Sequence, residues 1–522
     1  MYENLSQNTM AMIKAYQDGL RKDTTTSGTD ISTGLNFYYL EPKAKALYPV
    51  YYPMLASTPR VYPMFNGMRV GGTGVNWKAI VGIDIGGYPA VPEGRRNESM
   101  NLTTRNYYSA FKFMAKDANV TFQAQAAGLG LDDNIAITQL SQLNAMLNDE
   151  ERMMLFGNSG PANVGGNGYA LGPTSTPVCT QVADTVSTVT NATYYVYAVA
   201  LTAWGVHLAN STGVMLPRSR QSADGGEDTI NGGTGIISLI SNGIVVDGAH
   251  KSFTVTVPAS VGAFGYAWYV GTSNDKTANY FYGVTSFNKL TVNANPVATN
   301  QTADATDSST HKGLSTDNSY NLIDFDGVTT WHVGTYGASQ QAYLKDLAGK
   351  GLTSLGNGMI KEFEDCADYL WSNFKASVDT IWVGGNLINA VTQAILGTGA
   401  SGNGSARYMF SSSDGSILIG GSKVLQYRWK YSVTGAPKVV DVKTHPWLPN
   451  GSILFDITVN PYPAAGGQIP AVRRIVSLED HFSIKWPYRT LLHELGIYCF
   501  ETMEHYLPFC GGVLTGVNNT VE

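Results

Sequence analysis

The chain has 522 residues, of which 43% are hydrophobic and only 14% charged, with a formal net charge of -6 and a pI near 5.8. This length exceeds what one hydrophobic core serves and predicts two to four compact units. The acidic balance argues against a dedicated nucleic-acid-binding protein, which would carry a basic surface, and the low charge content favours self-association over large areas.

The first 60 residues are predicted to form an N-terminal arm and an entry strand. Residues 1 to about 36 are polar and contain one short amphipathic segment followed by a Thr/Ser/Gly run, which is typical of a mobile arm. The start lacks the basic end and apolar core of a signal peptide, and no apolar run is long enough to span a bilayer. We therefore expect a soluble protein made in a cytoplasm.

Residues 61–117 are Gly-rich, and their alternating pattern predicts a long two-stranded β-ribbon with Arg95 and Arg96 near its far end. A ribbon of that length cannot bury both faces on its own chain. Trp77, Lys78, Arg95 and Arg96 are therefore candidate contacts with a neighbouring subunit. The two arginines would pair with its acids, because a guanidinium matches a carboxylate.

Residues 118–172 contain the most informative pattern, a strand followed by one long amphipathic helix. Asp132 and Asp133 supply an N-cap, and Gly157 stands where a left-handed C-cap would end the helix. We call this segment the spine helix. Its buried stripe is predicted to comprise Ala136, Leu140, Leu143, Leu147 and Met154.

Residues 173–315 are rich in Thr, Val, Tyr, Ser and Gly, with strand-like alternation at 194–199, 252–257 and 266–270. Short strands separated by turns predict a β-sandwich. The piece TYYVYAVALTAWG resembles fibronectin type III or immunoglobulin-like modules. The flanks are helical, so we expect an inserted domain with its own core, placed outward and dispensable for assembly.

Residues 316–384 predict a second helix, from about Asn357, and a strand, while residues 385–460 and 461–522 are mainly strand-like. The helix has an apolar side and an acidic side that is expected to be solvated. Pro449-Asn450-Gly451 predicts a turn, since proline presets one φ and Asn-Gly accepts positive φ. The apolar side comprises Ile360, Phe363, Ala367, Leu370 and Phe374, and the acids are Glu362, Glu364, Asp365 and Asp368.

Four stretches in this order resemble the major capsid (major head) proteins of tailed bacteriophages: the spine segment from Asn119, the second-helix segment from Asn321, DVKTHPWLPNGSILFDI from Asp441 and HYLPFCGGVLTGV from His505. The resemblance implies an α+β, HK-like capsid fold. Its parts would be an arm (1–60), an extended loop (61–117), a peripheral domain (118–172 and 316–384), an axial domain (385–460) and a C-terminal return (461–522), with the β-sandwich (173–315) inserted.

This resemblance also implies a structural function. The protein would form hexamers and pentamers of an icosahedral head around double-stranded DNA, assembled in the host cytoplasm and kept in the virion. Portal, scaffolding or decoration proteins are implied partners, contact with the packaged DNA would be nonspecific, and no membrane is involved. A ribbon lysine crosslinks subunits in some relatives, which makes Lys78 a candidate.

The sequence offers no catalytic, cofactor-binding or metal-binding set. HELGIYCF has Ile497 where a zinc helix needs its second histidine, and the four cysteines form no Cys-x-x-Cys pair. We therefore expect no enzyme activity, no cofactor and no metal. The alternative is a β-rich phage surface or tail-fibre-type protein that binds a receptor or glycan, although a fibre should show repeats and heptads that are absent.

Overall fold

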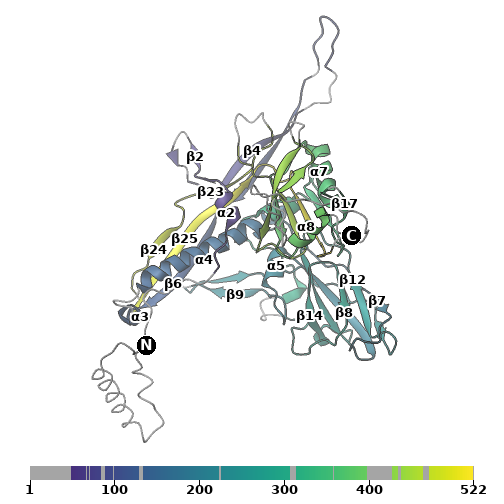
Figure 1. Ribbon diagram of the computed structural model, residues 1–522. Coiled ribbons are helices and arrows are strands. Elements are labelled where there is room, and N and C mark those ends of the chain that lie inside the picture. Colours follow the sequence, from purple (N-terminus) through teal and green to yellow (C-terminus); the bar gives the residue numbers. More distant parts are fainter. Residues whose placement is uncertain are drawn as a thin grey trace, which may run out of the picture.

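The computed structural model describes residues 49–520 except 66–67, 70, 84–88, 98, 128–132, 223–224, 306–312, 357, 397–425, 433–436, 463–468 and 489. The predicted arm lies outside the described residues as far as residue 48. The rest is an α+β fold, as predicted, made of three bodies and a projecting ribbon (Figure 1).

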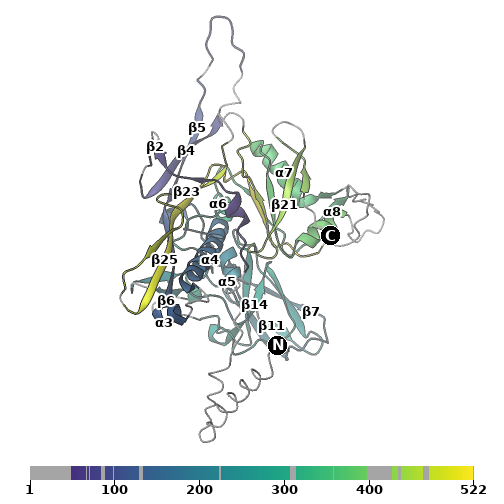
Figure 2. The same ribbon diagram turned by 60° about the vertical axis from the view of Figure 1, so that its left-hand side comes forward.

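The first body is the spine helix α4 (Asn134–Phe156) lying across a five-stranded sheet (Figures 1 and 2). The predicted helix is confirmed, and the Asp133 side chain caps it by accepting hydrogen bonds from the N–H groups of Ile135 and Ala136. Asp132 lies outside the described residues. The sheet contains β1 (Arg60–Val61), β6 (Lys112–Thr121), β23 (Val472–Val476), β24 (Phe482–Lys485) and β25 (Leu492–His505).

The predicted buried stripe of the spine helix is partly wrong. Met154 is fully buried, but Leu140 is 57% exposed, Ala136 is exposed, and Leu143 and Leu147 are half-buried. The face on the sheet instead carries Gln142, Met146, Glu150 and Met154, which follow one another at helical spacing. Polar residues occupy this face because the sheet offers partners, such as the Leu495 carbonyl, which accepts from Gln142 Nε2 at 2.9 Å.

The end of the spine helix also differs from the prediction. Gly157 has a φ of -49°, so it is not a left-handed cap. Glycine is required there for a close approach, since a Cβ would lie 2.1 Å from the Phe325 carbonyl oxygen. After the helix the chain continues in an extended conformation, directly beside the segment that returns from the inserted domain.

The second body is a six-stranded sheet with α7 (Lys361–Phe374) and α8 (Ile388–Leu396). One core joins α7 and β19 with α8 and the later strands, so the predicted boundary between residues 384 and 385 falls inside a single unit. Helix α7 begins after Asn357 because the hairpin of β17 (Ser354–Gly356) and β18 (Met359–Ile360) precedes it. The sheet contains β16 (Tyr343–Asp346), β19 (Thr380–Gly384), β20 (Gln426–Trp429), β21 (Lys438–His445), β22 (Ile453–Asp456) and β26 (Gly512–Thr515).

The expected apolar side of α7 is buried from Ile360 to Leu370, and Phe374 is half-buried. One acid departs from the expectation of a solvated face. Glu362 is 3% exposed, because its carboxylate accepts from the Thr353 N–H at 3.0 Å. Gly451 has a φ of +82°, which supports the turn predicted between β21 and β22.

The third body is a β-sandwich, in which a three-stranded and a four-stranded sheet share one core. Strands β7 (Val178–Val182) and β8 (Ala192–Leu201) lie in different sheets, whereas an immunoglobulin domain places its first two strands in the same sheet. The likeness to immunoglobulin modules therefore does not extend to strand order. The other strands are β11 (Ile244–Val246), β12 (Ser252–Thr256), β13 (Gly265–Gly271), β14 (Asn279–Thr285) and β15 (Lys289–Val292).

The sandwich does not have a fully separate core, in contrast to the prediction. Ala203, at the start of α5 (Ala203–Leu208), and Phe264, at the start of β13, pack in the same buried cluster as Met154 and Trp331. Replacing residues 175–315 with a linker would remove this packing. We therefore expect that deletion to destabilise the first body rather than leave it unchanged.

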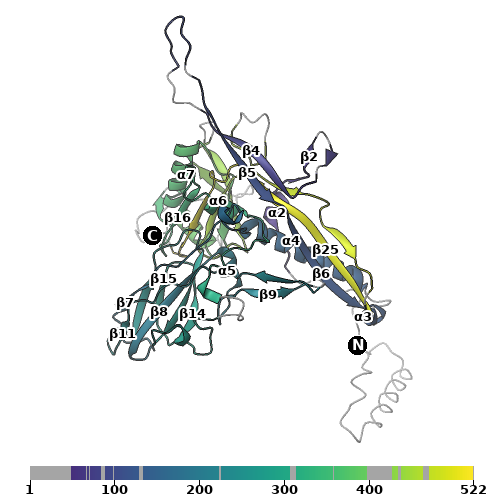
Figure 3. The ribbon, with the colours of Figure 1, turned by 180° about the vertical axis from the view of Figure 1, so that it is seen from behind.

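The predicted ribbon is present as the antiparallel pair β4 (Gly74–Ile83) and β5 (Leu102–Ala110), which leaves the bodies and projects beyond them (Figures 1 and 3). No helix among the described segments is long and apolar enough to cross a bilayer. The remaining elements are α2 (Pro53–Ser57), β2 (Met64–Phe65), β3 (Met68–Arg69), α3 (Phe122–Ala127), β9 (Arg218–Gln221), β10 (Glu227–Ile230), α6 (Val328–Gly334) and short 3-10 turns at 162–164, 276–278 and 313–315.

Candidate functional site at the end of the spine helix

The segment from Glu150, in the last turns of α4, to Asn158, two residues after the helix ends, contacts every body of the molecule, and we call this segment the junction. Glu150, Glu151, Met154, Leu155 and Phe156 are all buried. Two adjacent carboxylates in a buried position must be paired, because burying an unpaired charge costs several kcal/mol. Each of them is paired, and with a different body.

Glu150 points into the five-stranded sheet. Its carboxylate pairs with Arg474 of β23 and lies 2.7 Å from His481 Nε2. Arg474 also contacts Glu501 at 3.0 Å and Asp480 at 3.2 Å, so one guanidinium holds three acids. The spine helix is thereby tied to β23, to β25 and to the turn between β23 and β24 through one charged centre.

Burial shapes the charges of this centre. Burial opposes the protonated form of His481, but hydrogen bonds to Asp480 and Glu150 outweigh it and raise its pKa to about 9. Burial, followed by the nearby Glu150 charge, raises the pKa of Glu501 well above its usual range. The centre is therefore expected to hold a protonated His481 and a neutral Glu501 at neutral pH.

Glu151 points the other way and caps helix α2. Its two oxygens accept from the N–H groups of Met54 at 2.8 Å and Leu55 at 2.6 Å. These are free donors of the first helical turn, and the N-cap residue Tyr52 makes no side-chain cap. The same carboxylate lies 2.7 Å from Nε2 of His445, at the end of β21, so Glu151 joins the entry segment to the six-stranded sheet.

Arg152 links the sandwich to the junction. Its guanidinium lies 5.3 Å from the ring of Trp204 on α5 and 5.1 Å from the ring of Trp447, which follows β21. Burial lowers the pKa of Arg152, but the group stays charged because its ordinary pKa is above 12. A cation between two indole faces contributes about 1 to 2 kcal/mol per ring where water is excluded.

Asn158 closes the junction on the strands that enter and leave the sandwich. Its Nδ2 donates to the carbonyls of Tyr169 at 2.9 Å and Ser319 at 3.1 Å. Its Oδ1 accepts from the N–H groups of Gly160 and Tyr169. The two connections of the inserted domain are thus held together by one buried amide.

Two histidines lie behind the junction, between α6 and the end of β25. His332 and His505 are fully buried with ring centroids 5.4 Å apart. His332 Nδ1 lies 2.7 Å from the Pro508 carbonyl, and His505 Nδ1 accepts from the Leu507 N–H. Burial lowers the pKa of His332 to about 4, and burial together with His332 lowers that of His505 well below its usual range.

This pair predicts an acid-sensitive fold. Both groups are neutral when folded but take up protons near pH 6.5 when unfolded, so the free energy of unfolding should fall as pH drops from about 6.5 to 4. His332 alone accounts for about 3 kcal/mol of that loss at about 1.4 kcal/mol per pKa unit. Chemical denaturation across this range measures it. His332→Asn should reduce the slope of stability against pH, and an unchanged slope would mean that other groups cause the acid sensitivity.

The predicted contact residues fall into two groups. Trp77 is 6% exposed and stacks on Tyr107 at 5.5 Å within the chain, so it cannot serve as a surface contact. It is buried because the base of the ribbon packs on the first body. Lys78, Arg95 and Arg96 are exposed.

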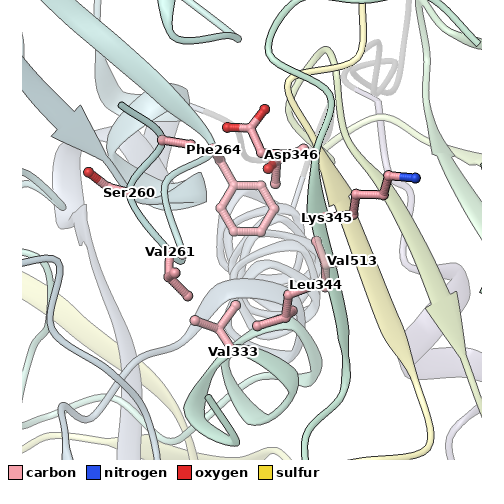
Figure 4. A pocket seen from close by; sticks show the side chains of 11 residues that line it. Ser260, Val261, Phe264, Val333, Leu344, Lys345, Asp346 and Val513 are labelled. Carbon is pink, nitrogen blue, oxygen red and sulfur yellow. The ribbon is translucent and has the colours of Figure 1, made fainter. Parts of the chain in front are cut away.

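A small cavity of about 90 Å³ lies where the sandwich meets the second body (Figure 4). Phe264, Val261, Val333, Leu344 and Val513 form its apolar wall, with Asp346 at one side. Its lining carries no group of residues arranged for proton transfer or nucleophilic attack. The cavity is a packing gap between two bodies.

The pairing of the junction residues could not be predicted from local pattern, because partners such as Glu151 and His445 are far apart along the chain. The signal that was available is the acidic pair inside an otherwise amphipathic helix, at a position that the helical period turns inward. Acids at such positions are paired or they would not be buried.

No family model and no curated protein matches the chain. Solved structures align over most of it at low identity. The holo-SrpI encapsulin complex from Synechococcus elongatus PCC 7942 is 8% identical over 95% of this chain and 98% of the other, with a TM-score of 0.36. The capsid of Myoviridae phage XM1 is 7% identical over 94% of this chain and 100% of the other, with a TM-score of 0.37. The cyanophage A-1(L) capsid is 9% identical over 93% of this chain and 98% of the other, with a TM-score of 0.39.

Proposed function

We propose that this chain is a structural major capsid protein of a tailed bacteriophage, with an HK-like capsid fold. Many copies would close into hexamers and pentamers and tile an icosahedral head around double-stranded DNA. Rings of this kind need heterologous contacts, in which different surfaces of two copies meet. The feature that carries the proposal is the ribbon, whose outer part is exposed and uncovered by any of the residues that the structure describes.

The outer ribbon is apolar and exposed. Ile83 and Leu102 face each other across the two strands and are 55% and 54% exposed, and Ile80 is 65% exposed. Val91 and Met100, further out, are 43% and 60% exposed. Several exposed apolar side chains on one projecting arm are typical of a protein-binding site, because their contact with water is unfavourable.

The junction supports the same proposal from inside the subunit. A shell subunit is pulled by several neighbours at once, so its bodies must keep fixed positions while the contacts between copies carry the load. Glu150 and Glu151, which are buried, and Arg152, which is half-buried, each tie a different body to one helix. Such ties resist relative motion without restricting the ribbon.

The remaining parts of the proposal follow from that function. The protein would reside in the virion after assembly in the host cytoplasm, with portal, scaffolding or decoration proteins as further partners. Contact with packaged DNA would be weak and nonspecific, given the net charge of -6. No enzyme activity is part of the proposal.

Electron microscopy and sedimentation of the purified chain test the proposal. Closed shells or capsomers are the expected result. Rods would favour the tail-fibre alternative, and dispersed monomers at all concentrations would contradict self-assembly. A scaffolding protein added in trans separates failure to nucleate from failure to associate.

The double variant Ile83→Asp with Leu102→Asp should fold normally and fail to assemble. Both side chains are exposed, so the free energy of unfolding should change by less than about 0.5 kcal/mol. Val186→Asp is the matched control, because Val186 is 88% exposed but lies on the sandwich. Shells from the ribbon variant in normal yield would contradict a ribbon contact.

Changing Arg95 and Arg96 to Glu should leave the monomer folded and weaken the shell. Both side chains are exposed on the ribbon, where repulsion from a neighbour's acids would replace attraction. The measurement is particle yield and dissociation in rising salt. Lysine at both positions keeps the charge and should behave closer to the unchanged protein; if the glutamate variant assembles equally well at low salt, the arginines are not contacts.

A further inference from the structure

Next to the charged centre of the junction, the fold gathers three different metal-ligating side chains. Asp480, His481 and Cys499 each offer a donor atom, and these atoms all lie within 4.8 Å of one another. Asp480 and His481 stand in the turn between β23 and β24, while Cys499 is a fully buried residue in the middle of β25. Within the described part of the chain this is the group of His, Cys and acidic residues that meets such a spacing.

We propose that Asp480, His481 and Cys499 form a binding site for zinc or a similar divalent transition-metal ion. Thiolate, imidazole and carboxylate are the three donor types that zinc takes in proteins. The site is independent of the proposed capsid function and would serve stability. An ion there would fasten the β23–β24 turn to the centre of β25 directly beneath the spine helix.

The orientation of His481 fits a metal ligand. Its Nε2 lies 2.7 Å from Glu150, and its Nδ1 lies 3.3 Å from Asp480 Oδ1. A histidine ligand commonly donates its second ring N–H to a carboxylate, here Glu150, which fixes the ring. The ion would replace the proton that Nδ1 shares with Asp480 in the metal-free cluster. Two nitrogen or oxygen donors on one tetrahedral zinc lie about 3.3 Å apart, given bonds of about 2.0 to 2.1 Å.

A second observation points to the same place. Glu501 is fully buried beside the group, and no N–H of the described residues donates to its Oε1, which leaves Glu150 as its neighbour. Glu501 lies two residues after Cys499 on β25, so both side chains project from the same face of the strand toward Arg474 and α4. Two buried carboxyl groups side by side repel each other when both are ionised, and a cation beside them would relieve that repulsion.

The charged groups around the site can also pair with one another, and that metal-free ionic cluster competes with metal binding. Arg474 contacts Glu150, Asp480 and Glu501, and Arg60 pairs with Asp480 from the edge of the sheet. Without a metal, these arginines and the histidine neutralise the acids as a closed ionic cluster. With a metal, Asp480 would be shared between Arg474 and the ion, as ligating carboxylates commonly are with a second partner.

The test is zinc binding by the full-length chain, purified without chelator under reducing conditions. We expect elemental analysis to find close to one zinc per chain, and the melting temperature to fall on chelation and recover with added zinc. Cobalt in place of zinc should show the thiolate-to-metal absorption band in the near ultraviolet. Absence of bound zinc, of that band and of a melting shift would establish the closed ionic cluster instead.

Variants distinguish this site from other cysteines. Cys499→Ser should lose the cobalt band and most zinc, whereas Cys510→Ser, at an equally buried position outside the group, should keep both. Glu150→Gln should retain the band and bind zinc about 10- to 100-fold more weakly. Unchanged binding in Cys499→Ser overturns the proposal. If Cys499→Ser does not fold, His481→Asn is tested in its place: loss of most zinc supports the proposal, and unchanged zinc binding overturns it.

Discussion

Met154→Asp should yield no soluble, folded protein. Met154 is fully buried in the hydrophobic cluster where the spine helix, the sandwich and α6 meet. An aspartate there must either stay charged in an apolar site or take up a proton, and it also leaves a cavity. The combined loss is about 4 kcal/mol or more, a large part of the stability of a typical domain.

Leu140→Asp is the control for that variant on the same helix. Leu140 is 57% exposed, so the substitution should change the free energy of unfolding by less than about 0.5 kcal/mol. Soluble yield and thermal melting of the two variants give the comparison. A soluble Met154→Asp protein that melts near the unchanged chain would show that this face of the helix is not the packed one.

The contrast between these two residues shows how far the sequence could predict the spine. The helix itself follows from its cap at Asp133, its length and the absence of breaking residues. Its buried face could not be predicted in the same way. The apolar residues at helical spacing are mainly leucines, whereas the structure buries Glu150 and Gln142. Only the sheet's donors explain that choice, and they come from strands far away in the sequence.

The inserted domain shows the same limit. Alternation predicted strands that became β8, β12 and β13, because one side of each faces a shared core. The strand order, and the packing of Phe264 against the spine, depend on contacts between distant segments. Local sequence pattern therefore predicts where a strand forms, whereas the residues that pack against its buried side chains depend on the whole fold.

Glu151→Ala should destabilise the protein by about 3 kcal/mol or more, because each buried donor left without an acceptor costs about 1 to 3 kcal/mol. The change removes the acceptor for the N–H groups of Met54 and Leu55 and leaves His445 without its carboxylate. All of these groups are buried, so water cannot replace the lost oxygen atoms without opening the structure. Urea unfolding should show a lower midpoint with an unchanged slope.

Asp149→Ala, one helical position earlier than Glu150, is the matched control. Asp149 pairs with Lys116 and Arg152 while its side chain stays 27% exposed, so its loss should cost less than about 1 kcal/mol. A double-mutant cycle between Glu151→Ala and His445→Ala then isolates their contact, and a coupling of at least about 1 kcal/mol is expected. Additive effects would mean that Glu151 acts on α2 alone, and that the entry segment and the six-stranded sheet are joined to the spine by separate contacts.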